Sequence, residues 1–180
     1  VISGVASDSQ RAAIRRRLEK EFRHVFVNGY SPKDGAYFSP AYSFFIFQGL
    51  YELGLAGVAE NLIREGWGWM LAQGAVTTPE FFEFRASHCH AWSACPMYYL
   101  SKEALGVRFP QAPDHSWVEI DIQSDLDWAE GAYPIPGTDH AIAVKWSRDE
   151  QGRIEAAVEA PAEVQVRWDA SRIKVTAGVL

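Results

Sequence analysis

The fold is decided within residues 105–122, LGVRFPQAPDHSWVEIDI, where the spacing of the apolar residues changes. Before Gly106 the apolar residues recur every three or four positions, as they do on one face of a helix. From Ser116 to Ile122 polar and apolar residues alternate, as they do on a strand with one buried face. Helices first and strands last predict an α+β protein in two parts, a helical part over 1–106 and a strand part over 107–180.

Four helices are expected in the first part, and three of them have recognisable ends. Ser39 followed by Pro40 is typical of an N-cap with proline at the first helical position. Gly74 is placed to end the third helix, and Ser87 is a candidate cap for the fourth. The second helix leaves almost no polar face, so it should be covered on nearly all sides. The expected helices are 8–26, 39–53, 56–71 and 87–106.

Short alternating segments dominate the second part. The run Asp149-Glu150-Gln151-Gly152 predicts a hairpin turn between two of them. Several short strands at this spacing predict an antiparallel β-sandwich. Its tryptophans at positions 117, 128, 146 and 168 are expected to pack mostly in the core. The expected strands are 116–122, 141–146, 153–158, 163–168 and 172–179.

Charge and composition exclude several classes of partner. Seventeen basic and 23 acidic residues give a net charge of −6 without a basic block, which argues against a nucleic-acid partner. The most apolar run, Tyr42 to Leu53, is shorter than the roughly 20 residues that a bilayer requires, which argues against a membrane partner. Cys89 and Cys95 make no disulfide framework, so we expect free thiols and a reducing compartment such as the cytoplasm.

One segment, Thr77 to Ser93, concentrates the residue types of a sugar site. Sugar binding needs aromatic rings against C–H faces, planar groups for the hydroxyls and, for hydrolysis, a carboxylate that accepts a proton from water. The segment supplies aromatic rings, Glu80, Glu83, Arg85, His88 and His90.

Each of these residues also has a plainer interpretation. The two glutamates are then solvated loop acids, and the histidines are a capping residue and a buried, hydrogen-bonded residue. A zinc site is not expected, because residues two apart on a helix point about 200° away from each other. The sequence has no P-loop, no GxGxxG after a strand and no GxSxG, so no cofactor is expected.

Several motifs, taken in order, resemble the C-terminal part of bacterial α-L-rhamnosidases of glycoside hydrolase family 78. The resemblance spans roughly residues 38–168. Members of this family are inverting hydrolases in which an (α/α)6 catalytic barrel precedes a β-sandwich. The motifs are Ser39-Pro40-Ala41-Tyr42, Trp67-Gly68-Trp69-Met70-Leu71, Ser87-His88-Cys89-His90-Ala91-Trp92, Leu126-Asp127-Trp128-Ala129-Glu130-Gly131 and Pro134-Ile135-Pro136-Gly137.

The resemblance implies hydrolysis of terminal α-L-rhamnosides. The family's general base lies in the loop before the last helix. A count without gaps from Gly74 places this base at Glu80, whereas an aromatic residue directly before the acid selects Glu83. The sugar-binding histidine corresponds to His90, and Trp92 is an accompanying ring. Phe82 and Arg85 complete the set of substrate-binding candidates.

The family's general acid comes from an earlier part of the barrel, and residues 1–75 contain no matching acidic cluster. Four helices are also too few for a barrel of twelve. The sequence therefore predicts a C-terminal piece, or a subunit, that is inactive without the remainder of the enzyme or a second chain. The alternative is a non-catalytic module that binds carbohydrate or only supports a partner.

Overall fold

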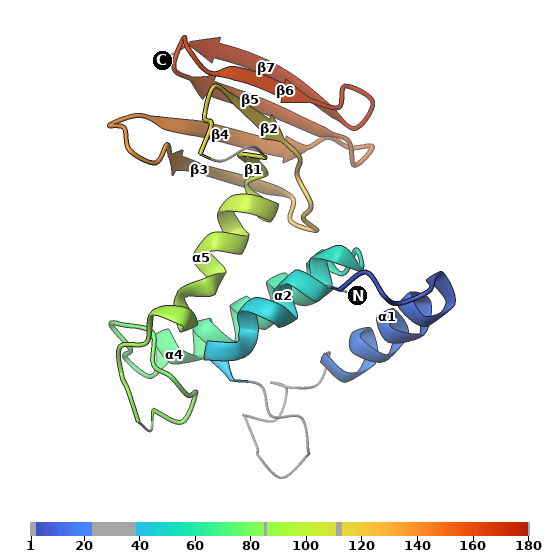
Figure 1. Cartoon of the computed structure of the whole chain (residues 1–180), viewed down its shortest axis with the longest axis vertical. Coiled ribbons are helices and arrows are strands. Elements are labelled where there is room, and N and C mark those ends of the chain that lie inside the picture. Colours follow the sequence, from blue (N-terminus) through green and yellow to red (C-terminus); the bar gives the residue numbers. More distant parts are fainter. Residues whose placement is uncertain (1–2, 23–38, 85, 111–112, 180) are drawn as a thin grey trace. The chain divides into compact units, whose positions relative to one another are not determined.

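A computed structural model describes residues 3–22, 39–84, 86–110 and 113–179 of the chain. Figure 1 shows helices in the first half of the chain and strands in the second, which confirms the α+β class. The chain divides into two compact units, Val1–Tyr98 and Tyr99–Leu180, and the division falls inside helix α5. Among the described residues, no helix combines the length and the apolar character that crossing a membrane requires.

The helical unit contains the expected helices, broken into α-helical, 3₁₀ and π segments. The first expected helix is described as far as Phe22, and its remaining residues lie outside the described ranges. The expected third helix is observed as a continuous run of three segments. The segments are α1 (Asp8–Phe22), η2 (Pro40–Tyr42), α2 (Ser43–Glu52), α3 (Ala56–Leu62), η3 (Ile63–Trp67), α4 (Gly68–Ala72), η4 (Ala91–Ala94) and α5 (Cys95–Tyr99).

The third helix ends at Gly74, as predicted. Gly74 has a φ of +85°, and its N–H donates to the carbonyl of Leu71 at 2.9 Å. The next N–H, of Ala75, donates to the carbonyl of Met70 at 3.0 Å. These two bonds satisfy carbonyls that the helix end leaves open, as in a Schellman motif, and direct the chain into the loop that follows.

Of the two predicted N-caps, Ser39 is confirmed in position and Ser87 is wrong. The last helix begins at Ala91 rather than at Ser87, because residues 87–90 hydrogen-bond to the preceding loop instead. Ser39 is the N-cap residue of η2 and Pro40 its first residue, as predicted, although the Ser39 side chain makes no capping hydrogen bond there. Its hydroxyl donates to the carbonyl of Glu80 at 3.4 Å, which links this helix start to the same loop.

The second unit starts with the end of the last helix, η5 (Leu100–Ala104), and contains seven strands in two sheets among its described residues. The predicted hairpin turn at Asp149 to Gly152 connects β4 and β5. One sheet has the order β1-β2-β6 and the other the order β3-β4-β5-β7. The strands are β1 (Val107–Arg108), β2 (Trp117–Ile120), β3 (Trp128–Pro134), β4 (Ala141–Arg148), β5 (Ile154–Ala160), β6 (Gln165–Trp168) and β7 (Ile173–Val179).

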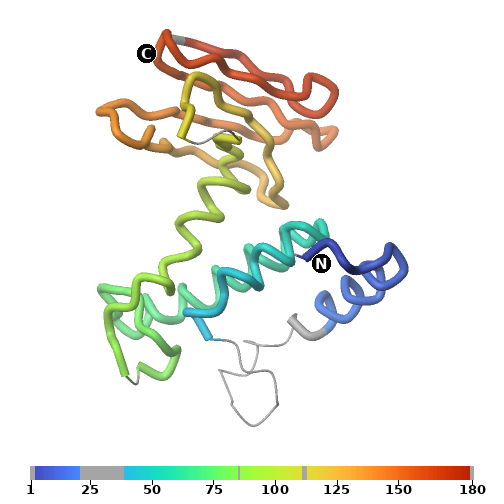
Figure 2. Tube along the Cα trace, viewed as in Figure 1, coloured from blue at the N-terminus to red at the C-terminus, as the bar shows by residue number. Residues whose placement is uncertain are grey.

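Both sheets are mixed, which differs from the expected antiparallel arrangement. The β2·β6 and β5·β7 pairs are parallel, while the β1·β2, β3·β4 and β4·β5 pairs are antiparallel. The chain leaves β5 for the other sheet, forms β6 there and returns as β7 beside β5. Two successive reversals restore the original direction, so β7 runs parallel to β5. Figure 2 follows this path in the red part of the trace.

The two sheets contribute to one hydrophobic core. Val118 and Ile120 come from one sheet, and Val144, Trp146 and Val158 come from the other. The indole N–H of Trp146 donates to the carbonyl of Ala104 at 2.8 Å, so this buried ring also has its polar atom satisfied. The expectation that most tryptophans of this unit pack in the core is wrong, because Trp128 is 65% and Trp168 is 37% exposed.

Candidate functional site

Glu80, Phe82, Glu83 and His90 lie on the loop between α4 and η4, and Trp92 lies in η4 itself. The N–H of Glu80 donates to the carbonyl of Ser87 at 2.8 Å, and the N–H of His90 donates to the carbonyl of Thr78 at 2.7 Å. The Thr78 hydroxyl donates to the His90 carbonyl at 3.1 Å. Residues 77–80 and 87–90 thus form two arms that are hydrogen-bonded to each other, with residues 81–84 and 86 at the tip.

Phe82 anchors the tip of the loop in the core of the helical unit. Its side chain is 1% exposed and meets the Trp67 ring edge to face, with the centroids 5.6 Å apart. Phe47 packs on the same indole at 5.7 Å. The substrate-binding role of Phe82 stays a prediction, but its buried ring offers no open face to a ligand in this structure. Its position instead fixes the residues on either side of it.

The two candidate carboxylates differ in their surroundings. Glu80 lies on the first arm and is partly buried, and its backbone is held by Ser87 and by the Ser39 hydroxyl. Glu83 lies at the tip and is exposed. Glu80 is also only two positions from Thr78, the backbone partner of His90. The loop therefore brings the backbone of Glu80, rather than that of Glu83, close to His90.

The tip of the loop contains two residues in a backbone conformation that favours glycine. Phe84 has a φ of 55° and Ala86 a φ of 62°. Such a conformation costs of order 1–3 kcal/mol for a residue with a Cβ, so the surrounding contacts must compensate for it. Phe84 supplies two of them, since its ring packs against Trp69 at 5.7 Å and its carbonyl lies 2.8 Å from Nε2 of His88. Strain of this kind is frequent at binding and catalytic loops.

His90 and Trp92 form the other side of the candidate site. His90 is partly exposed and directly precedes η4, and its ring meets Trp92 edge to face with the centroids 6.3 Å apart. Trp92 is 70% exposed, so a face of its indole is open to a ligand. Arg85 lies outside the described residues. In the part of the chain that the structure describes, no three histidine, cysteine or acidic residues gather as metal ligands do.

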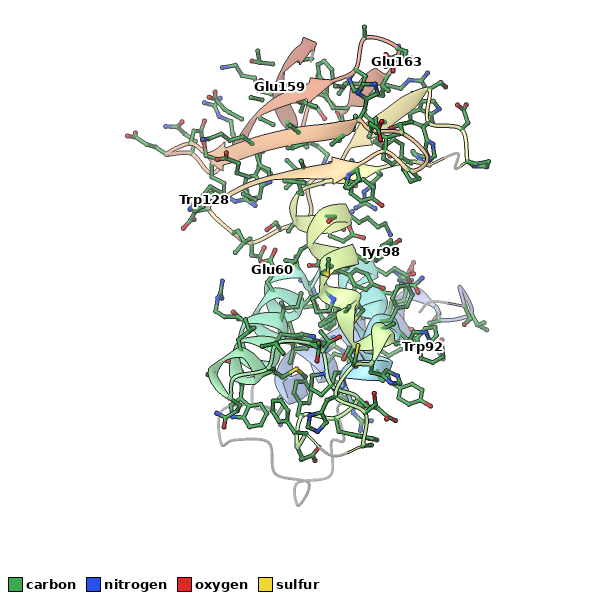
Figure 3. All side chains as sticks on the ribbon, turned by 90° about the vertical axis from the view of Figure 1, so that its left-hand side faces the viewer. Glu60, Trp92, Tyr98, Trp128, Glu159 and Glu163 are labelled. Carbon is green, nitrogen blue, oxygen red and sulfur yellow. The ribbon has the colours of Figure 1, made fainter. Side chains whose placement is uncertain are left out.

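Sequence reasoning missed a pocket beside this loop. The pocket has a volume of about 470 Å³ and is lined by aromatic and small side chains of η2, α2, η4 and α5. Neither Glu80, Glu83 nor His90 is among the described residues that line it. Figure 3 shows Trp92 and Tyr98 on the same side of the helical unit. The lining residues are Ala41, Phe44, Phe45, Ala91, Trp92, Ala94, Cys95 and Tyr98.

The elements that line the pocket carry several exposed apolar side chains. Tyr42, Phe45, Trp92, Met97 and Tyr98 are each between 42% and 73% exposed. The sequence predicted a helix over 39–53 with almost no polar face, which should be covered on nearly all sides. In the structure Phe44 and Phe45 of this helix are 37% and 59% exposed, so part of its apolar surface is open. Exposed apolar residues that gather on one surface are typical of sites that bind a ligand or another protein.

Comparison with known proteins finds matches among solved structures. No family model matches the chain, and no curated protein matches it. Among solved structures, the chain is similar to a GH78 family rhamnosidase of Bacillus sp. GL1, with 31% sequence identity and a TM-score of 0.76. The match covers 99% of this chain and 19% of that chain. The chain therefore spans about a fifth of the length of that enzyme, and both of its units take part in the similarity.

Proposed function

We propose that this chain is part of a larger bacterial glycoside hydrolase that releases terminal α-L-rhamnose with inversion of configuration. The observation that carries the proposal is the 31% identity to a rhamnosidase along 99% of the chain. In this proposal residues 1–106 are late helices of an (α/α)6 barrel, and residues 107–180 are the β-sandwich that follows it at the C-terminal end. The similarity, the loop with its two glutamates and the exposed aromatic rings support this assignment.

Glu80 is the proposed general base. In an inverting enzyme one carboxylic acid protonates the leaving oxygen, and a second carboxylate, roughly 6.5–9.5 Å away, activates a water molecule on the opposite face of the sugar. Glu80 suits the second role because its backbone is held on both sides and lies near that of His90. Glu83, at the exposed tip of the same loop, is the alternative.

His90 and Trp92 are the proposed sugar-binding residues. A histidine ring offers one donor and one acceptor to vicinal hydroxyls, and an indole offers an apolar face to sugar C–H groups. The edge-to-face contact between the two rings fixes the histidine against the indole. Arg85 stays a candidate on sequence grounds alone, whereas buried Phe82 is left out as a ligand contact.

The remainder of the enzyme, on the same polypeptide or on a second chain, is the proposed partner of the apolar surface around Phe45 and Trp92. That remainder also supplies the general acid. Two observations support the partner: the chain spans 19% of the similar rhamnosidase, and the surface exposes several large apolar side chains. Burial of such side chains stabilises an interface by about 25 cal/mol for each Å² of apolar area removed from water.

Turnover of p-nitrophenyl α-L-rhamnopyranoside tests the proposal. The isolated chain is expected to be inactive. In the enzyme that contains the chain, Glu80→Gln is expected to lower kcat by roughly 10²-fold or more with little effect on binding. Glu83→Gln is the matched control, because it removes a charge from the same loop and should change kcat only slightly.

Other outcomes select other functions. A large effect of Glu83→Gln with none of Glu80→Gln would move the base to Glu83. If neither substitution lowers turnover, neither glutamate is the base. If no rhamnoside is hydrolysed but rhamnose binds and His90→Ala abolishes that binding, the chain is a carbohydrate-binding module. Substantial activity of the isolated chain would contradict the proposal that the general acid lies elsewhere.

A further inference from the structure

Trp128 is the most exposed tryptophan of the strand unit. It begins β3, its side chain is 65% exposed, and Figure 3 shows it at the margin of the four-stranded sheet. Exposed and partly buried residues alternate along β3, so Trp128 shares the outer face of the sheet with Glu130. An exposed indole offers an apolar face on which the C–H groups of a sugar ring can stack.

Polar side chains from all four strands lie in rows beside this indole. In the first row the strand register places Trp128 opposite Ser147, Ser147 opposite Glu155, and Glu155 opposite Lys174. In the second row Glu130 lies opposite Lys145. Directly opposed side chains are about 5 Å apart and diagonal ones about 7–8 Å, so Ser147, Glu130 and Lys145 lie within reach of a small ligand on the indole. Glu155 and Lys174 lie two and three strands away from it.

The charges in these two rows neutralise each other. Lys145 Nζ lies 2.9 Å from a Glu130 carboxylate oxygen, and Lys174 Nζ lies 2.8 Å from a Glu155 carboxylate oxygen. A lysine ammonium has three donors and a carboxylate accepts about four hydrogen bonds, so each pair keeps capacity for further partners. An open aromatic ring beside the neutralised Glu130–Lys145 pair, with both donors and acceptors, suits a neutral polyhydroxylated ligand better than an ion.

The other exposed or partly exposed tryptophans of this unit lack these surroundings. The guanidinium of Arg167 lies over the Trp117 ring, 4.2 Å from its centroid, and covers one face of it. Trp168 is 37% exposed and ends β6 in the other sheet. Trp146 is buried. Trp128 is therefore distinguished from the other three by its exposure.

We propose that the outer face of the β3-β4-β5-β7 sheet binds a neutral pyranose ring stacked on Trp128, with hydroxyls bonded by the Glu130–Lys145 pair and by Ser147. This site is separate from the loop that carries Glu80 and involves no chemistry. It gives the strand unit a role in holding an oligosaccharide. With one stacked ring and a few exposed hydrogen bonds, the Kd is expected to be on the order of 1 mM.

Chemical-shift titration of the ¹⁵N-labelled full chain tests the site. The probes are methyl α-L-rhamnopyranoside and cellobiose, added to millimolar concentrations, and the indole signal of Trp128 is identified by its loss in Trp128→Phe. At least one probe is expected to shift that indole and the amides of Ser147 and Lys145 along one saturable curve. Trp128→Ala should weaken binding at least about 10-fold, and Trp128→Phe, which keeps a ring, should weaken it less.

Trp168→Ala is the matched control and should leave the curve unchanged. The variants should keep the signals of the buried core, because Trp128 lies outside it. The proposal is overturned if neither probe shifts the Trp128 indole, or if Trp128→Ala binds as tightly as the unmodified chain. Shifts confined to His90 and the loop around Glu80 would also overturn it while supporting the proposed function of the helical unit.

Discussion

The indole N–H of Trp67 donates a 2.7 Å hydrogen bond to the carbonyl oxygen of Ser93. This buried bond joins the third helix to the first turn of the last one, and the loop with Glu80 and Glu83 lies between those two residues in the sequence. Phe82, at the tip of that loop, packs on the same indole. Trp67 therefore contacts the loop at Phe82 and the helix that follows it at Ser93, so its ring supports the candidate site from both places.

Trp67→Phe is expected to destabilise the helical unit. The phenyl ring keeps part of the packing, but the Ser93 carbonyl loses its donor in a buried position, which costs about 1–3 kcal/mol. Urea unfolding should show this loss, and the amide hydrogens of Glu80 and His90 should exchange faster. Trp69→Phe, at a ring that is 38% exposed, is the control and should change both quantities little.

Gly106→Ala is expected to destabilise the strand unit. Gly106 has a φ of +83°, and an added Cβ would lie 2.5 Å from Cγ1 and 3.1 Å from Cα of Ile122. Strain and the clash together should cost about 2–4 kcal/mol. Gly152→Ala is the matched control, because its φ is +76° with no neighbour within 4 Å, and it should cost only about 1–2 kcal/mol. Equal losses in urea unfolding would contradict the clash.

The two cysteines are expected to differ sharply in reactivity. Burial raises the pKa of the Cys95 thiol from 9.0 to about 12, whereas Cys89 is exposed. Because the thiolate is the reactive form, Ellman's reagent at about pH 8 should modify Cys89 rapidly and Cys95 only after unfolding. Cys89→Ser should abolish the rapid phase. Rapid modification of both thiols in the folded chain would show that Cys95 is accessible.

The hairpin turn at Asp149 is expected to make stability depend on pH in acid. Its carboxylate accepts hydrogen bonds from the N–H of Arg153 at 2.8 Å and of Gln151 at 2.9 Å. The bond from the Arg153 N–H is the main cause that lowers the pKa of Asp149 below its ordinary value of 3.8. The stabilisation is therefore complete above pH 3.8 and is lost as the pH falls through the lower pKa of the folded state.

Asp149→Asn tests this dependence, because asparagine keeps an acceptor oxygen but does not titrate. The urea midpoint of the unmodified chain should exceed that of the variant at neutral pH, and the difference should shrink below about pH 4. The effect should also decrease in high salt, since the carboxylate lies on the surface. A difference that stays constant with pH would contradict a role for the charge.

The sequence by itself determined the class, the order of the elements and the segment to inspect. The spacing of apolar residues was sufficient to assign helices and strands, because a period of 3.6 residues indicates a helix and a period of 2 residues a strand. It placed the helix end at Gly74, the hairpin at Asp149 to Gly152, and the dense polar and aromatic run from Thr77 to Ser93.

Only the tertiary structure decided what each residue of that run touches. Pairing between residues 77–80 and 87–90 moved the start of the last helix from Ser87 to Ala91, and the indole of Trp67 drew Phe82 into the core. The sequence also did not predict the parallel pairing of β5 with β7 or the exposure of Trp128. Local patterns indicate that a residue prefers burial or a given backbone shape, but partners distant in the sequence decide which of the available apolar residues becomes buried.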